Sequence, residues 1–248
     1  MARQVLNYHD VQLYDSDVAL FAHSQWLNDN TINFYFQFLL RSLCLQQRDD
    51  GDSSSSSSDV LFVDPAVVSC MILQCDDDDE YQELGTGLQL QQKQLCFIPV
   101  NDNEHFGGES SHWSLLVYCR ATHSFEHFDS SAGHNTRAAK RIKSTFEKML
   151  QLCAISSGVN SASTGIEPAA TFENVRDAPQ QRNGYDCGMY VLVVAEYLCR
   201  QRVQLSSASS SKNQLTLQEF VTPERVTKTR LEMPALIRRL QLEQEAQK

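Results

Sequence analysis

One cysteine of this sequence stands where a thiol could act as a nucleophile. Cys187 follows an Asn-Gly turn dipeptide at 183–184 and Asp186, a favourable N-cap residue, and the apolar run 188–199 is long enough for a buried helix. In the first turn of a helix, unpaired backbone N–H groups and the helix macrodipole favour the thiolate. By itself, this stretch fits a core cysteine beside a helix equally well.

A histidine and an aspartate can be brought together by a hairpin. The aromatic and aliphatic segments 112–119 and 124–129 favour two strands joined by a short connection. If Cys119 faces Ser124, His112 lies opposite residue 131, within two positions of Asp129. The imidazole and the carboxylate would then emerge at the same open end of the hairpin, although each alone could be an ordinary polar residue at a sheet edge.

An exposed thiol, a histidine and a carboxylate form the arrangement that nucleophilic catalysis by cysteine requires. In this chemistry His112 takes the proton of Cys187 and later gives one to a leaving amine, while Asp129 holds the imidazole ring. Gln181, six positions before Cys187, can point its amide back toward the sulfur. With the backbone N–H of Cys187 it could form an oxyanion hole, although alone it would be a surface glutamine.

The remaining segments supply the elements that must position these side chains. The spacing of the apolar residues predicts an amphipathic helix from a cap near 28–30 and another over 137–153, with Asn135 available as its cap. Residues 60–73 favour a short strand or turn leading into a helix, and 95–100 and 171–175 favour strands. A last helix begins at Thr222-Pro223 and restarts at Met233-Pro234. The loop 101–111, with two glycines, is expected to be mobile.

We expect a single catalytic domain over residues 1–248, with flexible insertions at 47–59, 75–80, 154–165 and 205–213. The second of these holds four consecutive aspartates. Basic residues near the C-terminus are expected on a solvated helix face: Arg225, Lys228, Arg230, Arg238 and Arg239.

Charge and composition exclude several classes of protein. With 31 acidic and 21 basic side chains the formal charge is -10, which argues against a nucleic-acid groove and would attract a basic protein partner. We find no secretory signal and no run of apolar residues long enough to span a membrane. The eight cysteines mostly have apolar neighbours, which favours reduced thiols in the cytoplasm or nucleus, and the lack of a Cys-x-x-Cys pair gives little support to a metal site.

Four motifs resemble those of the Ulp-type (sentrin/SUMO-specific) cysteine proteases. They are Trp26-Leu27-Asn28-Asp29, His112-Trp113-Ser114-Leu115-Leu116, Phe128-Asp129-Ser130 and Gln181-Arg182-Asn183-Gly184-Tyr185-Asp186-Cys187-Gly188. The order His, Asp, Cys is also the family's, whereas in papain the cysteine comes first. The segment 98–103 before a Gly-Gly loop and the Thr222-Pro223 ending look most similar to the deneddylase branch. The resemblance extends from about residue 5 to about residue 240.

The resemblance implies a papain-like α+β fold of the Ulp type, a mixed sheet flanked by helices. It implies a monomeric isopeptidase without a cofactor that cleaves after the C-terminal Gly-Gly of the NEDD-type ubiquitin-like modifier, in conjugates such as those of cullins and also in the modifier's precursor. Trp26 and Trp113 would roof a narrow tunnel for the modifier tail, and Asp29 would contact the tail. Asn101 would contribute from the loop 101–111, which would close over the bound modifier.

Three alternatives stay open on the sequence alone. A SUMO- or ubiquitin-specific protease shares all the catalytic motifs. An acyltransferase could use the same Cys/His pair with an acyl-CoA donor. An inactive modifier-binding module would have lost a catalytic residue, whereas His112, Asp129, Gln181 and Cys187 are all present.

Overall fold

The computed structural model describes residues 2–45, 59–103, 110–156, 168–206 and 215–246. They form two compact units, one of residues 1–52, 129–132 and 176–248 and the other of residues 53–128 and 133–175. Most of the insertions expected at 47–59, 154–165 and 205–213, and the Gly-Gly of the loop 101–111, lie outside the described residues. The single catalytic domain stays a prediction.

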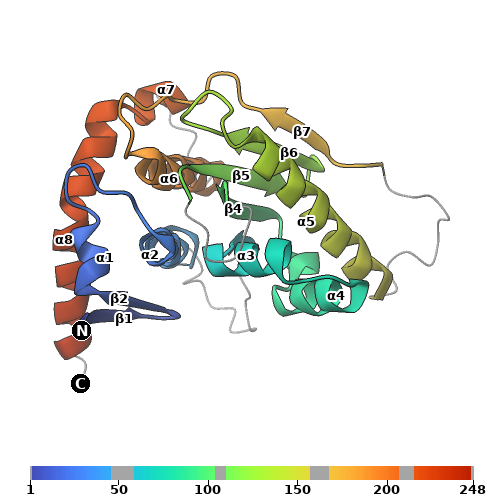
Figure 1. Cartoon of the computed structure of the whole chain (residues 1–248), viewed down its shortest axis with the longest axis horizontal. Coiled ribbons are helices and arrows are strands. Elements are labelled where there is room, and N and C mark those ends of the chain that lie inside the picture. Colours follow the sequence, from blue (N-terminus) through green and yellow to red (C-terminus); the bar gives the residue numbers. More distant parts are fainter. Residues whose placement is uncertain (1, 46–58, 104–109, 157–167, 207–214, 247–248) are drawn as a thin grey trace. The chain divides into compact units, whose positions relative to one another are not determined.

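A five-stranded mixed sheet forms the centre of the second unit (Figure 1). Its order is β3 (Val60–Phe62), β4 (Leu95–Asn101), β5 (Trp113–Cys119), β6 (Ser124–Phe128) and β7 (Thr171–Asn174). The two outer pairs are parallel and the two inner pairs are antiparallel. Cys119 pairs with Ser124, which confirms the predicted register, and the β5–β6 ladder ends with Leu115 opposite Phe128. The chain therefore leaves the hairpin directly into Asp129.

Helices pack with this sheet around one apolar core. They are α3 (Pro65–Leu73), α4 (Asp78–Gly87), the short 3-10 helix η3 (Leu90–Gln92) and α5 (Thr136–Ser156), which lies across the strands in Figure 1. Helices α3 and α5 pack against the strands, and the other two pack against α5. Phe146 of α5 and Phe125 of the sheet are fully buried in the shared core. Asp64 caps α3 by accepting from the backbone N–H of Ala66 at 2.7 Å, with Pro65 as the first helical residue. The predicted strand leading into a helix is thus confirmed.

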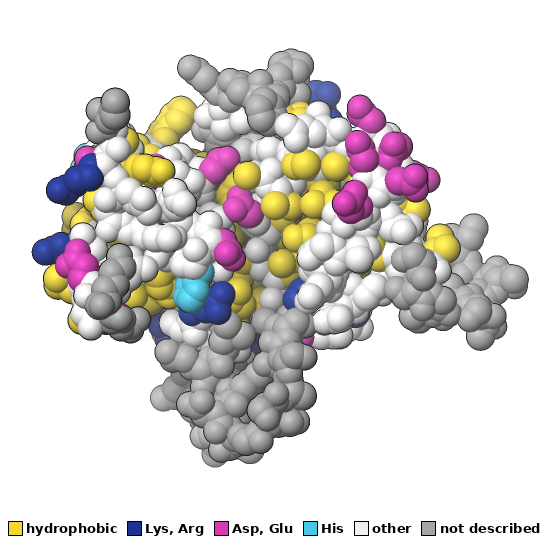
Figure 2. All heavy atoms as spheres, turned by 90° about the horizontal axis from the view of Figure 1, so that it is seen from below, with side chains coloured by type: hydrophobic (Ala, Val, Ile, Leu, Met, Phe, Trp, Pro, Cys, Tyr) yellow, Lys and Arg dark blue, Asp and Glu magenta, His cyan; other side chains and the backbone are white. Residues whose placement is uncertain are grey.

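The aspartate run expected as a loop over 75–80 instead starts a helix. Asp77 is the N-cap of α4, with its Oδ1 accepting from the backbone N–H of Glu80 at 2.9 Å. Acidic side chains in a first turn are stabilised by the positive end of the helix macrodipole. Asp78 also pairs with Lys148 at 2.6 Å. Figure 2 shows acidic side chains gathered over α4. The cap and the first-turn position give the aspartates a role in starting this helix.

The first unit begins with a hairpin of β1 (Gln4–Tyr8) and β2 (Val11–Tyr14), followed by α1 (Asp15–Ala19). Helix α2 (Asp29–Leu39) starts where the sequence predicts, because Asn28 Oδ1 accepts from the backbone N–H of Thr31 at 3.0 Å. It continues into a π-helical segment, η1 (Leu40–Leu45).

In the described part of this unit, three more helices follow: α6 (Cys187–Ser206), α7 (Leu217–Phe220) and α8 (Pro223–Ala246). Helix α6 packs against both α2 and α8. The predicted restart at Met233-Pro234 is wrong, because α8 runs through Pro234 without a break. A proline removes one helical hydrogen bond, but the buried face of α8 holds the helix on either side of it. Across the described ranges, no helix is both long and apolar enough to cross a membrane.

Candidate active site

Asn183 builds the turn that precedes Cys187. Its Oδ1 accepts hydrogen bonds from the backbone N–H groups of Tyr185 at 3.1 Å and Asp186 at 3.0 Å, which is how a short polar side chain fixes a turn. Gly184 does not supply a left-handed conformation, and a Cβ there would meet open space. The Asn183 side chain therefore fixes the turn through which the chain enters α6, whose first residue is Cys187.

Cys187 is buried, with 3% of its surface exposed, so the expectation of an exposed thiol is wrong. The next residue explains part of this burial. A Cβ at Gly188 would lie 3.0 Å from the Cβ of Leu27 and 3.2 Å from its Cγ. The segment that follows Trp26 therefore packs so closely against the first turn of α6 that a Cβ at position 188 would force Leu27 to shift.

The Asp186 carboxylate forms hydrogen bonds with two other side chains and does not make the predicted cap. Its Oδ1 accepts from Nε of Arg230 at 2.9 Å, and its Oδ2 accepts from Nδ2 of Asn183 at 2.7 Å. The Arg230 and Asp186 side chains are only 4% and 7% exposed. The expectation of a solvated helix face is therefore wrong for Arg230. A signal was present in the sequence, since Arg230 shares the helical spacing of the buried Val226 and Met233.

Gln181 is held at both polar atoms of its side chain. Its Oε1 accepts from the Ser130 hydroxyl at 2.7 Å, and its Nε2 donates to the carbonyl of Asn183 at 2.6 Å. Its backbone N–H also donates to the carbonyl of Ser130 at 2.9 Å. Because a backbone carbonyl only accepts, these partners define which end of the amide is the nitrogen.

Asp129 is buried in the same unit as Gln181 and Cys187. Its Oδ1 accepts from the backbone N–H of Ser131 at 2.9 Å, and its carbonyl accepts from Nε2 of Gln180 at 2.9 Å. The other end of the Gln180 amide accepts from the backbone N–H of Ala132 at 2.8 Å. The segment that leaves the hairpin is thereby tied to the segment that carries Gln181.

His112 lies in the other unit, directly before β5, and 5% of its surface is exposed. Its carbonyl accepts from Nδ2 of Asn135 at 3.1 Å, and its ring meets the ring of His134 edge-on, with the centroids 5.0 Å apart. Asn135 stands just before α5, and its side-chain amide also donates to the carbonyl of Val100 at 3.3 Å. The expected cap of α5 by Asn135 stays a prediction. The backbone at His112 is thus fixed to the start of α5 and to the end of β4.

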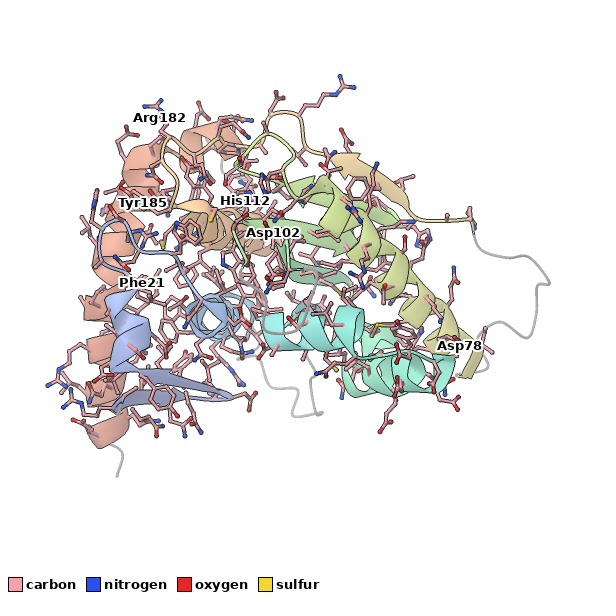
Figure 3. The ribbon with its side chains drawn as sticks, viewed as in Figure 1. Phe21, Asp78, Asp102, His112, Arg182 and Tyr185 are labelled. Carbon is pink, nitrogen blue, oxygen red and sulfur yellow. The ribbon has the colours of Figure 1, made fainter. Side chains whose placement is uncertain are left out.

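Asp102 organises the backbone in front of His112. It accepts hydrogen bonds from the Ser110 hydroxyl at 2.9 Å, the Ser111 N–H at 2.8 Å and the His112 N–H at 3.1 Å, as well as from the Ser111 hydroxyl. Burial alone would raise the pKa of Asp102, but these hydrogen bonds outweigh burial and hold that pKa well below its usual range. Figure 3 labels Asp102 and His112. This role was not predicted, because in the sequence Asp102 is only one residue of the segment 98–103 that looks similar to the deneddylase branch.

The predicted substrate-binding residues are divided between the two units. Trp26 is 50% exposed and Asp29 is the exposed first residue of α2, both in the first unit. In the second unit, Asn101 ends β4 and pairs with Trp113, the buried first residue of β5. Their roles toward a substrate stay predictions. Among the described residues, no group of His, Cys, Asp and Glu side chains is placed to hold a metal ion.

Residues 25–225 match the Ulp1 protease family, C-terminal catalytic domain. The chain belongs to this family. It is 32% identical over 249 residues to NEDD8-specific protease 1 of Arabidopsis thaliana, covering 97% of this chain and 95% of that protein. It is 33% identical over 234 residues to sentrin-specific protease 8 of Homo sapiens, covering 94% and 95%. The chain is therefore a cysteine protease, as predicted.

Solved structures of this family share the fold. One, the SUMO protease Ulp1 with its catalytic cysteine oxidised to a sulfinic acid, is 18% identical with a TM-score of 0.64 and covers 97% of this chain and 90% of that one. Another, the C-terminal Ulp1 protease domain in complex with Smt3, the yeast ortholog of SUMO, is 17% identical with a TM-score of 0.61 and covers 97% and 89%. These similarities confirm the α+β Ulp-type fold with its mixed sheet.

Proposed function

We propose that this Ulp1-family protease is a cysteine isopeptidase that cleaves after the C-terminal Gly-Gly of the ubiquitin-like modifier NEDD8. The observation that carries the proposal is the similarity to a NEDD8-specific protease along 97% of the chain. The 32% identity extends over a length that includes all four motifs that resemble those of the Ulp-type proteases. The likeness to solved SUMO proteases, at 17–18% identity, supports the fold alone.

In the proposed mechanism, Cys187 is the nucleophile and His112 is the general base. His112 takes the thiol proton as Sγ attacks the carbonyl carbon of the last glycine, and the carbonyl oxygen takes up the negative charge. His112 then gives the proton to the leaving amine as the C–N bond breaks, which leaves a thioester. Water hydrolyses the thioester by the same proton transfers, and Asp129 keeps the imidazole oriented throughout.

The negative charge on the carbonyl oxygen requires donors that are already in place. We assign this role to Nε2 of Gln181 and the backbone N–H of Cys187. In support, the bonds from Ser130 and to Asn183 hold the Gln181 amide in one orientation before any substrate binds. Donors that need no reorganisation during the reaction are those that lower its barrier most.

The proposal extends to the modifier tail and to the conjugates. Trp26, Asp29, Asn101 and Trp113 would bind the tail, with the aromatic side chains leaving room only for glycine near Cys187. Conjugates such as those of cullins would be substrates, and the modifier precursor would be processed by the same reaction. The protein would act as a monomer in the cytoplasm or nucleus.

Fluorogenic C-terminal amides of NEDD8, SUMO and ubiquitin test this choice. We expect kcat/KM for the NEDD8 amide to exceed the other two by at least about tenfold, which corresponds to about 1.4 kcal/mol of discrimination. Cys187→Ala should abolish the cleavage. Faster cleavage of the SUMO amide than of the NEDD8 amide would overturn the choice of modifier.

A further inference from the structure

We infer that Arg230, on the C-terminal helix α8, is a positioning residue for the Gln181 oxyanion donor, which it orients through Asp186 and Asn183. The inference rests on the proposed function, because it assigns Gln181 the role proposed there. Arg230 touches no reacting atom in this account. It sets the geometry of the turn that carries both Gln181 and Cys187.

The guanidinium of Arg230 joins three segments that are far apart in the sequence. Besides the bond from Nε to Asp186, Nη2 donates to the carbonyl of Tyr185 at 3.0 Å, and Nη1 donates to the carbonyls of Leu20 at 2.9 Å and Ala22 at 3.3 Å. It also lies 5.6 Å from the centre of the Tyr185 ring. Figure 3 shows Tyr185 beside α8. All three guanidinium nitrogens are therefore engaged, two of them with the residues directly before Cys187.

A continuous series of hydrogen bonds leads from Arg230 to Gln181. Asp186, fixed by Arg230 through one oxygen, accepts from Nδ2 of Asn183 at 2.7 Å through the other. This orients the Asn183 amide so that its Oδ1 faces the turn, while the Asn183 carbonyl accepts from Nε2 of Gln181 at 2.6 Å. One N–H of Nε2 is used in this bond, which leaves the second as the oxyanion donor.

Only arginine can make this set of contacts. A lysine would keep the positive charge near Asp186, but its single ammonium cannot reproduce a planar fork that bonds a carboxylate and three carbonyls. Complete removal of the charge would leave Asp186 buried without its cation, which is strongly destabilising. Arg230→Lys is therefore the variant that disturbs the geometry while sparing the charge.

The first test is the kinetics of Arg230→Lys on the NEDD8 amide. Since loss of a whole oxyanion donor costs about 10²–10³ in kcat, misplacement of Gln181 should lower kcat about tenfold and change KM less than about twofold. Arg225→Lys is the matched control. Arg225 lies on the same helix and pairs with the buried Glu196 at 3.3 Å, so the same substitution there should leave kcat near that of the wild type. Equal losses of kcat in both variants would overturn the inference.

A double-mutant cycle with Gln181→Ala separates positioning from a general structural effect. If Arg230 acts through Gln181, Arg230→Lys should lower kcat less than about twofold once the amide is gone. An unchanged tenfold loss in both backgrounds would contradict the inference. Should Arg230→Lys not fold, Asp186→Asn, which breaks the same series one step later, is measured in the same cycle with the same two outcomes.

The cycle also distinguishes this inference from the proposed function. Cleavage of the NEDD8 amide by the wild type together with an additive cycle would refute the role of Arg230 alone. Absence of cleavage of any modifier amide by the wild type would refute the proposed function, and the inference with it.

Discussion

Ser130 is the second support of the proposed oxyanion donor. Its hydroxyl donates to Oε1 of Gln181 and is 2.7 Å from it, in a residue that is 6% exposed. Without this bond, the amide of Gln181 can rotate away from the orientation that places Nε2 as a donor. We predict that Ser130→Ala lowers kcat for the NEDD8 amide about tenfold, a fraction of the 10²–10³ expected for losing the donor itself, with little change in KM.

Ser131→Ala is the control for this prediction. It removes the hydroxyl of the next residue. The hydrogen bond from Ser131 to Asp129 is donated by the backbone N–H, which the substitution keeps. Its kcat should match that of the wild type. A Ser130→Ala variant with wild-type kcat would show that the Gln181 amide needs no such support.

Asp102 makes stability depend on pH. Its pKa is lower in the folded protein than in the unfolded chain, so the carboxylate stabilises the fold above its unfolded pKa of about 4, and this contribution is lost as the pH falls through the folded value. We predict that Asp102→Asn lowers the free energy of unfolding by about 1–3 kcal/mol at pH 7. The difference from the wild type should shrink as the pH is lowered below about 4, measured by denaturant unfolding.

The exposed Asp78 provides a comparison for that measurement. Its side chain is 67% exposed and pairs with Lys148 on the surface. Asp78→Asn should change the free energy of unfolding by less than about 1 kcal/mol. A difference between wild type and Asp102→Asn that does not vary with pH would rule out the electrostatic role of Asp102.

Trp26 is an exposed aromatic residue whose predicted role is in binding. Because half of its surface is exposed, at 50%, truncation should cost little stability. We predict that Trp26→Ala raises KM for the NEDD8 amide about tenfold, in the range of an aromatic interface anchor, and leaves the melting temperature within about 2 °C of the wild type. Leu231→Ala, at a side chain that is 70% exposed on α8, should change neither quantity. Equal KM values for Trp26→Ala and the wild type would remove Trp26 from the binding site.

At the scale of the elements, the site depends on the close packing of Leu27 against the first turn of α6. Alanine is favoured over glycine inside a helix by about 1 kcal/mol, but a Cβ at Gly188 would meet the Leu27 Cβ, which cannot move without its backbone. Since overpacking costs about 1–3 kcal/mol, we predict that Gly188→Ala lowers the melting temperature and the activity. Gly184→Ala, where the space is open, should do neither. A more stable and fully active Gly188→Ala would contradict the close packing.

Elements with a local cause could be predicted from the sequence. The cap at Asn28, the Pro65 start of α3 and the Cys119–Ser124 register each depend on residues close together in the chain. The sequence also placed Cys187 in the first turn of a helix, because the turn residues and the apolar run adjoin.

Features that depend on distant partners could not be predicted in the same way. The sequence favours Asp186 as a cap, because it does not show that Arg230 lies against this carboxylate. The charge of Arg230 favours a solvated position, although its spacing places it on the buried face of α8. The aspartate run at the start of α4 was predicted to be a solvated loop. The helix begins there because of a cap and the macrodipole, and apolar spacing does not reveal either. Pro234 breaks a helix by local rules, but packing of α8 overrides them.

At the scale of the whole molecule, one thiol among the eight cysteines of the chain must react with a modifier C-terminus. The family, its fold and its protease chemistry follow from the match over residues 25–225 and from similarity along nearly the full chain. The choice of modifier depends on surfaces that bind the modifier, and it is therefore the part of the account that most needs a direct measurement.

That measurement is covalent labelling of the full chain by NEDD8, SUMO and ubiquitin, each carrying a C-terminal electrophile, with the labelled residue mapped by mass spectrometry. We predict that NEDD8 labels the protein in preference to the other two, that the adduct is on Cys187, and that Cys187→Ala is not labelled. Preferential labelling by SUMO or ubiquitin, or an adduct on another cysteine, would contradict it.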